Sequence, residues 1–165
     1  MQKLPESGRV RAIGVSNFGI THLERLLNAP GTKIIPAVNQ IELHPTCPSP
    51  KLVEYCKKKG IQCTGYSPLG GSPESPAQQS KVVVEMSQKY GKSVPQVLLA
   101  WGVQSGWPVL PKSVSKERIK ANFEGLKGWR LSEEDVKRLG AEVKERFKNC
   151  GDEWLPHKVF FGDDE

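Results

Sequence analysis

The chain reads Ile34-Ile-Pro-Ala-Val-Asn-Gln-Ile-Glu-Leu43, then a helix signal, then Ile61-Gln-Cys-Thr-Gly-Tyr66, and this stretch decides the fold. The helix signal begins at Ser49 and Pro50, a capping residue and a first-turn proline, and stops at Gly60. Both flanking runs are nearly continuously apolar, which is typical of strands covered on both faces. The stretch therefore predicts two parallel strands joined by a right-handed crossover helix.

The same alternation continues on both sides of this stretch. Val10–Val15 is a compact apolar run before it, and Pro108–Leu110 is a shorter one after it. Amphipathic runs predict further helices over Thr21–Asn28, Lys81–Tyr90, the residues after Ser93, Lys116–Asn122 and Ser132–Lys148. Four alternations of strand and helix predict an α/β fold with a parallel sheet.

Capping residues predict where two of these helices begin. Thr21 is followed three residues later by Glu24, and Ser93 by Gln96, which is the spacing of a capping box. The segment Pro68–Ser80 is rich in Gly, Pro, Ser and Gln, and it predicts a loop.

Length and charge bound the class of protein. The chain has 165 residues, whereas a complete (β/α)₈ barrel typically needs about 250, so a complete single-chain barrel is excluded. With 24 Lys and Arg against 18 Asp and Glu, the net charge is +6, which admits an anionic partner. No basic run exceeds the three lysines Lys57–Lys59, and a phosphate-bearing small molecule explains the charge as well as nucleic acid does. The charge alone motivates a nucleic-acid partner, and we expect none.

Neither a membrane span nor a signal peptide is predicted. No apolar run approaches the ~20 residues that a span needs, and no long apolar segment follows Met1–Leu4. There is no CxxC pair and no recognised zinc spacing among the four cysteines, Cys47, Cys56, Cys63 and Cys150. We expect a single partial domain over residues 1–165, cytoplasmic, with reduced thiols, no metal and an irregular tail over residues 150–165.

Polar side chains lie at or near the end of every predicted strand. They are Ser16–Asn17, Asn39–Gln40, Tyr66–Ser67 and Lys112–Ser113. In parallel α/β folds ligands bind at the edge formed by the carboxyl ends of the strands. The pattern favours a ligand site at this edge, although polar loops that simply begin where strands end would give the same pattern.

The segment from Lys112 to Asn122 has the sharpest local pattern. Lys112 and Ser113 leave a strand, and Arg118 and Asn122 are four residues apart, so these two share a helical face. A guanidinium, an ammonium and a hydroxyl near a helix N-terminus are suited to a phosphate monoester. From the residues alone, a solvated basic helix is an equal alternative.

Other candidate signals are weaker. No GxGxxG follows a strand, so a Rossmann fingerprint is absent. His44 is either a general base or a hydrogen-bonded structural residue, and the second reading is favoured. Tyr66 is either a proton donor or a ring face for a ligand. Packing, not base stacking, is the favoured role for the tryptophans, Trp101, Trp107 and Trp129.

Four motifs together resemble the aldo-keto reductase family, in the order and spacing of its C-terminal half. They are Val10-Arg-Ala-Ile-Gly-Val-Ser-Asn-Phe18, Val38-Asn-Gln-Ile-Glu-Leu-His-Pro45, Gly65-Tyr-Ser-Pro-Leu-Gly70 and Leu110-Pro-Lys-Ser-Val114 with Arg118 and Asn122. The segments at the two ends, Lys3–Arg9, Trp154–Pro156 and Val159–Gly162, look most like fungal NADP-dependent members that act on aldehydes or polyols. The resemblance implies the C-terminal half of a (β/α)₈ TIM barrel, about four βα units.

The resemblance also implies NADP(H) as the cofactor and assigns ten residues to it. Ser16, Asn17 and Gln40 match residues that bind the nicotinamide carboxamide, and Tyr66 matches the ring that stacks on the nicotinamide. The pyrophosphate contacts match Ser67 and Leu69. The adenosine end matches Lys112, Ser113 and Arg118 at the 2′-phosphate and Asn122 at the adenine. Two cations facing a dianionic phosphate would favour NADP over NAD.

Three departures from the family pattern qualify this reading. Ala121 stands where the family often has an acidic adenine partner, and the Gly70–Ser80 loop is shorter than usual. The motifs that carry the family's catalytic Asp, Tyr, Lys and His do not occur, so no catalytic residue is predicted and the chain reads as truncated. Carbonyl reduction needs an acid that protonates the developing alkoxide.

The predicted function is therefore an NADP(H)-dependent carbonyl or alcohol oxidoreductase that is inactive alone. Its substrate, once the enzyme is completed, would be a small aldehyde, ketone or polyol. The alternative is a non-catalytic NADP-binding or interaction subunit, because the open edges of a half barrel invite self-association.

Overall fold

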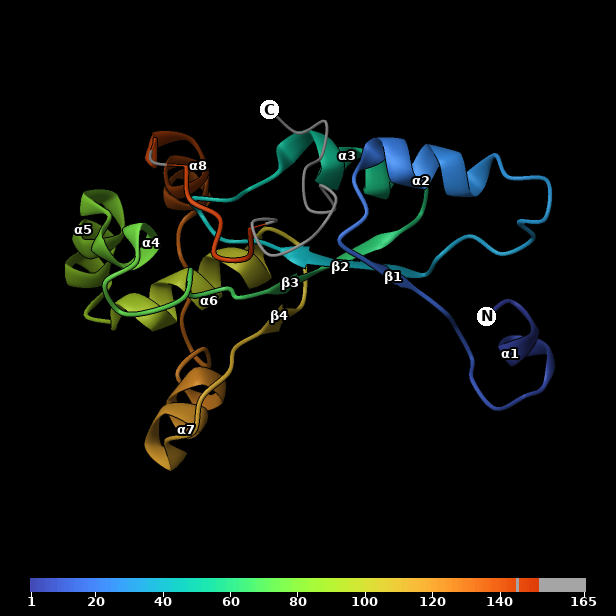
Figure 1. Ribbon diagram of the computed structural model, residues 1–165. Helices are drawn as coiled ribbons and strands as arrows, with labels where there is room; N and C mark the ends of the chain where they lie inside the picture. Colours follow the sequence, from blue (N-terminus) through green and yellow to red (C-terminus); the bar gives the residue numbers. More distant parts are fainter. Residues whose placement is uncertain (145, 152–165) are drawn as a thin grey trace. The chain divides into compact units, whose positions relative to one another are not determined.

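The computed structural model describes residues 1–144 and 146–151. Its strands are β1 (Val15–Ser16), β2 (Val38–Glu42), β3 (Gln62–Tyr66) and β4 (Val109–Leu110) (Figure 1). Its helices are α1 (Lys3–Glu6), α2 (Ile20–Leu27), α3 (Pro50–Lys58), α4 (Pro76–Gln79), α5 (Lys81–Tyr90), α6 (Val94–Gln104), α7 (Lys116–Glu124) and α8 (Glu133–Glu142). None of the helices in the described ranges is long and apolar enough to cross a membrane.

The four strands form one sheet in the order β1-β2-β3-β4. The pairs β1–β2 and β3–β4 are parallel, with Val15 opposite Asn39 and Tyr66 opposite Leu110. Parallel neighbours that follow one another along the chain require crossover connections, which the intervening helices provide. The predicted α/β class with a parallel sheet is therefore confirmed, and the carboxyl ends of paired strands share one edge.

The contacts divide the chain into two compact units. The first contains Met1–Ile41 and Ser49–Thr64, and the second contains Glu42–Pro48 and Gly65–Asn149. The core of the first unit includes Leu23, Leu52, Cys56, Ile61 and Cys63. The core of the second includes Leu43, Val83, Met86, Val97, Leu98, Leu99, Trp101 and Leu139. A single partial domain over residues 1–165 stays a prediction.

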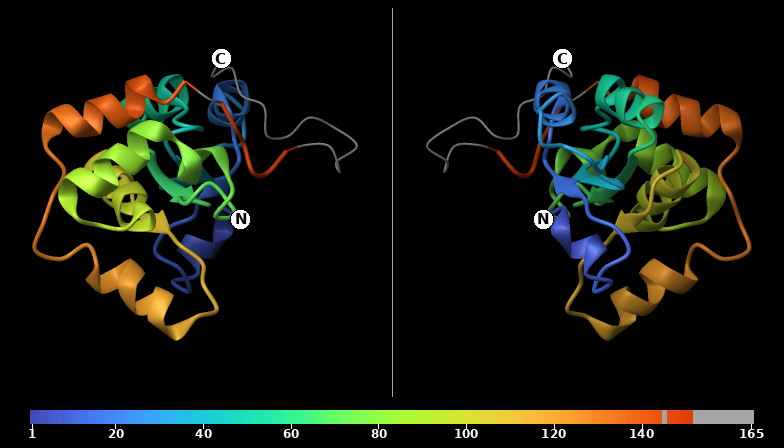
Figure 2. Two further views of the ribbon diagram at one scale, coloured as in Figure 1. Left: turned by 90° about the vertical axis from the view of Figure 1, so that its left-hand side faces the viewer. Right: turned by 90° about the vertical axis from the view of Figure 1, so that its right-hand side faces the viewer.

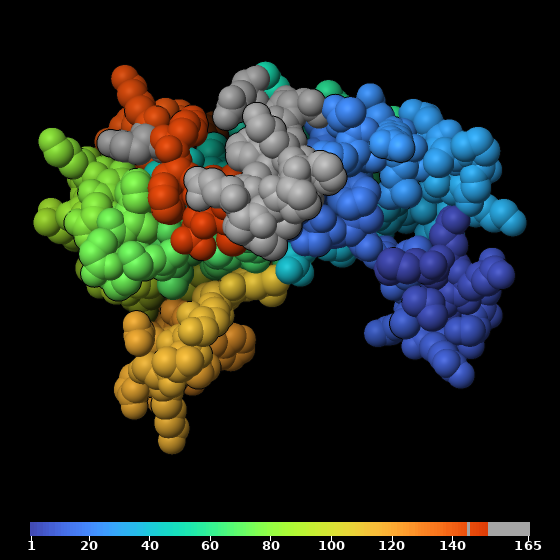
Figure 3. All heavy atoms as spheres, in the orientation of Figure 1, coloured from blue at the N-terminus to red at the C-terminus, as the bar shows by residue number. Residues whose placement is uncertain are grey.

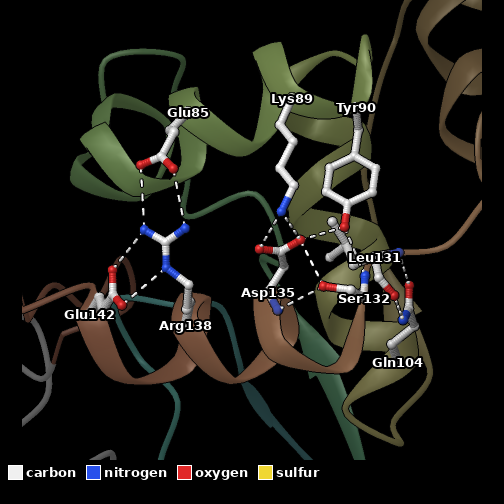
Figure 4. Close-up of polar contacts among 9 residues, drawn as sticks. All are labelled: Glu85, Lys89, Tyr90, Gln104, Leu131, Ser132, Asp135, Arg138 and Glu142. Carbon is white, nitrogen blue, oxygen red and sulfur yellow. Dashed lines mark hydrogen bonds and ion pairs between the residues drawn. The ribbon is translucent and has the colours of Figure 1, made fainter.

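Within the second unit, α5, α6 and α8 pack against one another (Figures 1 and 2). A chain of polar contacts joins α5 to α8 beside this packing (Figure 4). Asp135 accepts hydrogen bonds from Lys89 and Tyr90 at the end of α5, and Arg138 binds Glu85 on α5 and Glu142 on its own helix. These contacts fix the first turns of α8 against α5.

Some predicted element boundaries were wrong. Helix α2 begins after Gly19, and His22, not Glu24, makes the reciprocal cap bond, so Thr21 is not the capping residue. Helix α8 ends at Glu142, short of the predicted Lys148. The strands are shorter than their apolar runs, most of all β1, which has two residues. By contrast, the capping box of Ser93 and Gln96 is present as predicted.

Two short helices, α1 and α4, were not predicted. Helix α4 lies in the predicted loop Pro68–Ser80, where Ser75 caps it by accepting a hydrogen bond from the backbone of Gln78. The cap and the first-turn proline Pro76 are a standard start signal, but four residues are too few for a hydrophobic period. Residues 152–165, which include most of the predicted irregular tail, lie outside the described residues.

Candidate functional site

The first part of the candidate site lies at the end of β1 and beside Gln40 in the middle of β2. The carbonyl oxygen of Gln40 accepts two hydrogen bonds, one from the Ser16 hydroxyl at 2.9 Å and one from the Asn17 backbone N–H at 3.0 Å. These two bonds bring together the three residues that the sequence assigned to the nicotinamide. Their backbones are fixed by the pairing of Ser16 with Gln40 in the sheet register.

The chain turns sharply after β1. Asn17 has a φ of 59°, in the left-handed region that side chains other than those of Gly, Asn and Asp rarely adopt. Phe18, which follows, is held by Asn39: the Asn39 amide donates to the Phe18 carbonyl at 2.7 Å, and its oxygen accepts from the Phe18 N–H at 3.4 Å. The sequence reasoning placed Asn39 beside the site but gave it no role.

The second part of the site begins at the end of β3. Tyr66 is half-buried and pairs with Leu110, and Ser67 turns the chain with a φ of 46°. Ser67 accepts a hydrogen bond through its carbonyl from the Gly70 N–H at 2.8 Å, which closes a tight turn over Leu69. The sheet pairing thus fixes the backbone of Tyr66, and the hydrogen bond from Gly70 to Ser67 fixes the turn that follows it.

The loop that follows is tied back to Leu69. The Leu69 carbonyl accepts a hydrogen bond from the Gln78 side chain at 3.2 Å and one from the Ser75 hydroxyl at 3.5 Å. Gly70 lies so close to Ala77 that an added Cβ would come within 2.4 Å of the Ala77 Cβ. Residues 70–80 therefore fold onto the turn as a compact loop.

The third group of predicted residues lies around the start of α7. Ser115 caps this helix, accepting from the Arg118 N–H at 3.3 Å, and Ser113 in turn accepts from the Ser115 N–H at 3.2 Å. Lys112 and Arg118 are exposed, and within residues 1–144 and 146–151 neither forms an ion pair. Asn122 is half-buried one turn after Arg118.

One carboxylate also lies at this helix start. Glu117 accepts a hydrogen bond from the Ser115 hydroxyl at 2.7 Å, and this bond lowers the pKa of Glu117. The charged form also complements the helix dipole. The start of α7 therefore presents three exposed cations, Lys112, Lys116 and Arg118, and one carboxylate that is already bonded to the Ser115 hydroxyl.

His44 is a structural residue in this chain, as the sequence reading favoured. Its side chain is 0% exposed, with Nε2 at 2.8 Å from Glu42 and Nδ1 at 2.8 Å from the Thr46 hydroxyl. A general base has to reach a substrate, and both ring nitrogens here are engaged by buried partners. Trp101 and Trp107 are buried as predicted, and their rings meet edge to face at 5.4 Å.

The chemistry available to this site is recognition by hydrogen bonds and positive charge. In the first unit, amide and hydroxyl groups lie at the end of β1 and in the middle of β2. In the second unit, an aromatic ring lies at the end of β3, and exposed cations lie before and within the first turn of α7. In the described ranges no three His, Cys, Asp or Glu side chains cluster in a way that could hold a metal ion. Ser16, Asn17 and Gln40 belong to the first unit, and the other predicted residues belong to the second.

A parallel α/β sheet with polar residues near the carboxyl ends of its strands is typical of proteins that bind a ligand at that edge. Comparison with known proteins identifies the family. The Aldo/keto reductase family profile matches residues 1–143. The chain therefore belongs to the aldo/keto reductase family, which confirms the resemblance found in its four motifs.

Two curated relatives come from Saccharomyces cerevisiae. Aldehyde reductase YPR1 is 42% identical over 139 residues, which are 84% of this chain and 43% of that protein. Glycerol 2-dehydrogenase (NADP(+)) is 41% identical over 162 residues, which are 97% of this chain and 51% of that protein. The chain thus spans about half the length of these relatives, both of which are fungal, as the sequence indicated.

Solved structures of the same family are also similar. The aldose reductase from Schistosoma japonicum superposes with a TM-score of 0.85 at 32% identity, covering 100% of this chain and 52% of that one. MGS-M4, an aldo-keto reductase from a deep-sea metagenome library, gives a TM-score of 0.80 at 35% identity and covers 90% and 56%. The chain therefore has the fold of part of an aldo-keto reductase barrel.

Proposed function

We propose that these 165 residues bind NADP(H) in the manner of the aldo/keto reductase family. In this proposal Ser16, Asn17 and Gln40 bind the carboxamide of the nicotinamide, and Tyr66 offers its ring face. The pyrophosphate lies along the turn at Ser67 and Leu69. Lys112, Ser113, Arg118 and Asn122 bind the adenosine 2′-phosphate and the adenine.

The observation that carries this proposal is the position of two exposed cations at the capped start of α7. Lys112 precedes the cap residue Ser115, Arg118 donates its backbone N–H to that cap, and neither side chain forms an ion pair within the described part of the chain. Unpaired cations beside a helix N-terminus are suited to a phosphate dianion. The name of the related glycerol 2-dehydrogenase, which specifies NADP(+), agrees with this choice of cofactor.

The bound nicotinamide would supply hydride transfer to or from a small carbonyl or alcohol substrate. The protein's part is to orient the ring and to provide a proton for the developing alkoxide. No motif for the family's catalytic Asp, Tyr, Lys and His occurs in these residues. We therefore infer cofactor binding without aldehyde reduction by the 165-residue chain alone. We also propose a cytoplasmic location, a compartment in which thiols stay reduced.

Replacement of Arg118 by alanine tests the cofactor assignment. Calorimetric titration of the purified chain with NADPH and with NADH should show tighter binding of NADPH. Arg118→Ala should weaken NADPH binding about 10- to 100-fold, because hydrogen bonds to a charged group contribute about 1.5–3 kcal/mol. Binding of NADH, which lacks the 2′-phosphate, should change by less than about threefold.

Arg130→Ala is the matched control, since Arg130 is an exposed arginine of the same unit with no assigned role. It should leave the affinities for both cofactors unchanged. Equal loss of NADPH and NADH binding in Arg118→Ala would contradict the role assigned to Arg118. Aldehyde reduction by the isolated chain at rates typical of complete family members would contradict the inferred lack of turnover.

A second candidate function is self-association as an interaction subunit. It is favoured by four exposed apolar side chains along the segment from β4 through α7, namely Leu110, Val114, Ile119 and Phe123. β4 is an end strand of the sheet. An end strand with exposed apolar neighbours is a typical pairing surface, and the occupant proposed here is a second copy of this chain.

A further inference from the structure

Asn39 is a fully buried polar residue in the middle of β2. Its side chain is 0% exposed and lies within the first unit. The amide nitrogen donates to the Phe18 carbonyl at 2.7 Å and lies 3.8 Å from the Cys56 sulfur, while the amide oxygen accepts from the Phe18 N–H at 3.4 Å. A buried amide with both of its ends bonded is held in one orientation.

The two bonds to Phe18 replace a missing strand neighbour. Strand β1 ends at Ser16, and the turn at Asn17 takes the next residue out of the sheet register. The N–H and C=O of Phe18 would then lack partners from the β1–β2 ladder, and orphaned backbone groups are costly inside a protein. The Asn39 side chain offers one donor and one acceptor, as a peptide unit does.

Asn39 and Gln40 hold this turn from adjacent positions of one strand. Successive side chains of a strand point to opposite faces, so Asn39 reaches Phe18 on the face that carries Cys56 of α3, while Gln40 lies half-buried on the other face. The Gln40 carbonyl meanwhile holds Ser16 and Asn17. All three residues of the turn are therefore fixed by two consecutive residues of β2.

We propose that Asn39 is a positioning residue of the nicotinamide end of the site. It fixes the 16–18 turn so that the side chains of Ser16, Asn17 and Gln40 face one carboxamide together. Without it, Asn17 leaves its left-handed conformation, and the carboxamide contacts are lost while the contacts to the 2′-phosphate remain. The inference rests on the proposed NADP(H) site and adds a residue that does not touch the cofactor.

The test compares NADPH with adenosine 2′,5′-bisphosphate, which carries the phosphates of the adenosine end and no nicotinamide. Asn39→Asp keeps the shape and the acceptor but loses the donor to the Phe18 carbonyl. Asn39→Leu is similar in volume and loses both bonds, which keeps the test informative if the buried charge of the aspartate prevents folding. Calorimetric titration should show NADPH binding at least 10-fold weaker in both variants and bisphosphate binding changed by less than twofold.

Two controls separate positioning from general loss of stability. Cys56→Ala removes the sulfur contact with the Asn39 amide but leaves both bonds to Phe18, so this variant should keep the ratio of NADPH to bisphosphate affinity. Leu52→Ala opens a cavity in the core of the same unit, so it should lower the melting temperature while keeping the ratio of NADPH to bisphosphate affinity. Asn39 variants that lose both ligands equally, or that keep the original ratio, would overturn the inference.

Amide hydrogen exchange in the free protein supplies a readout that does not need a cofactor. The N–H of Phe18 should exchange at least 10-fold faster in Asn39→Leu than in the unsubstituted chain, with core amides of β2 much less affected. Unchanged exchange at Phe18 would overturn the inference even where NADPH binds. A chain that binds neither NADPH nor the bisphosphate would instead overturn the proposed function, and the exchange experiment would still decide the role of Asn39.

Discussion

Asp135 is a buried carboxylate surrounded by donors. Lys89 donates to both of its oxygens at 3.0 and 2.8 Å, Tyr90 donates to one of them, and the Ser132 hydroxyl lies 2.8 Å away (Figure 4). The hydrogen bonds from Lys89 and Tyr90 lower the pKa of Asp135 to about 2 against an ordinary value of 3.8, although burial opposes the shift. The folded state therefore binds this proton less readily than the unfolded state does.

The stability that Asp135 contributes should depend on pH in one direction. It is fully present above the unfolded pKa near 3.8 and is lost as the pH falls through that value towards about 2. Asp135→Asn should lower the free energy of unfolding at pH 7 by about 1–2 kcal/mol, after allowance for the solvent around Lys89. Urea unfolding measured at pH 7 and at pH 2.5 should show a smaller difference between variant and parent at the lower pH.

Glu85→Gln is the control for this prediction, since Glu85 joins the same two helices through an exposed ion pair with Arg138. Exposed pairs contribute little to stability, so its effect at pH 7 should be the smaller one. An Asp135→Asn effect that is as large at pH 2.5 as at pH 7 would contradict the assigned ionisation.

Single residues were predictable where their neighbours in sequence decide their role. Arg118 and Asn122 could be placed on one helical face because they are four residues apart, and Ser93 and Gln96 could be paired by their spacing. The role of Asn39 was not predictable, because its partner Phe18 is 21 residues earlier in the chain. A lone asparagine in an apolar run carries no signal of which backbone it will meet.

At the scale of elements, α6 and β4 approach each other at Gly102. A Cβ added to Gly102 would come within 2.6 Å of a methyl carbon of Val109 and 3.2 Å of the Trp107 indole nitrogen. Gly102 lies in the interior of α6 (Val94–Gln104), where glycine is normally unfavourable. The glycine is therefore explained by the packing of the helix against the strand.

Gly102→Ala should destabilise the protein even though alanine is the better helix former. Overpacking in a dense core costs about 1–3 kcal/mol, which exceeds the gain in helix propensity of about 1 kcal/mol. Chemical unfolding should show a lower midpoint for this variant. Gly140→Ala in α8, where an added Cβ would find ordinary contacts at 3.8 Å or more, should be neutral or stabilising, and stabilisation by Gly102→Ala would contradict the close packing.

Element starts were more predictable than element ends. Helix starts depend on local caps such as Ser93 and Ser132. The side chain of each accepts a hydrogen bond from the backbone N–H of the residue three positions later. The end of α8 depends on a distant contact: the backbone leaves the helix at Val143, and the Phe147 N–H then binds the Thr46 carbonyl at 3.1 Å. Helix periodicity through Lys148 could not reveal this competing partner.

For the whole molecule, the apolar residues near α7 have a testable consequence. Helix α7 has no buried residue and projects from the helices α5, α6 and α8 of its unit (Figures 1 and 3). Val114 is 82% exposed and Phe123 is 71% exposed. Ile119 and Phe123 are four residues apart on α7 and so share one helical face, and exposed apolar faces mark association surfaces, so the isolated chain should associate with itself.

Sedimentation velocity at micromolar concentration should detect dimers or larger species of the unsubstituted chain. Phe123→Lys should shift the distribution towards the monomer, because a charge placed in the contact must be desolvated. Ile35→Lys is the matched control, since Ile35 is an exposed apolar residue of the first unit and should leave the distribution unchanged. A stable monodisperse monomer of the unsubstituted chain would contradict self-association.

The parallel order of the sheet could be predicted because strand and helix alternate along the sequence. The division into two compact units could not, since it passes through β2 and β3 themselves. The family membership was also predictable, because the residues, order and spacing of the four motifs can be read directly from the sequence. The units are defined by contacts between residues that are far apart in the sequence, and hydrophobic periodicity carries no information about such contacts.

The left-handed turns at Asn17 and Ser67 bear on how this sequence can vary. With Ser49 they are the residues other than glycine that have positive φ within residues 1–144 and 146–151. Conformational energy alone would select glycine at both turns, by about 1 kcal/mol. A mutational library screened only for expression should therefore drift towards glycine there, whereas one screened for nucleotide capture should keep the amide and the hydroxyl.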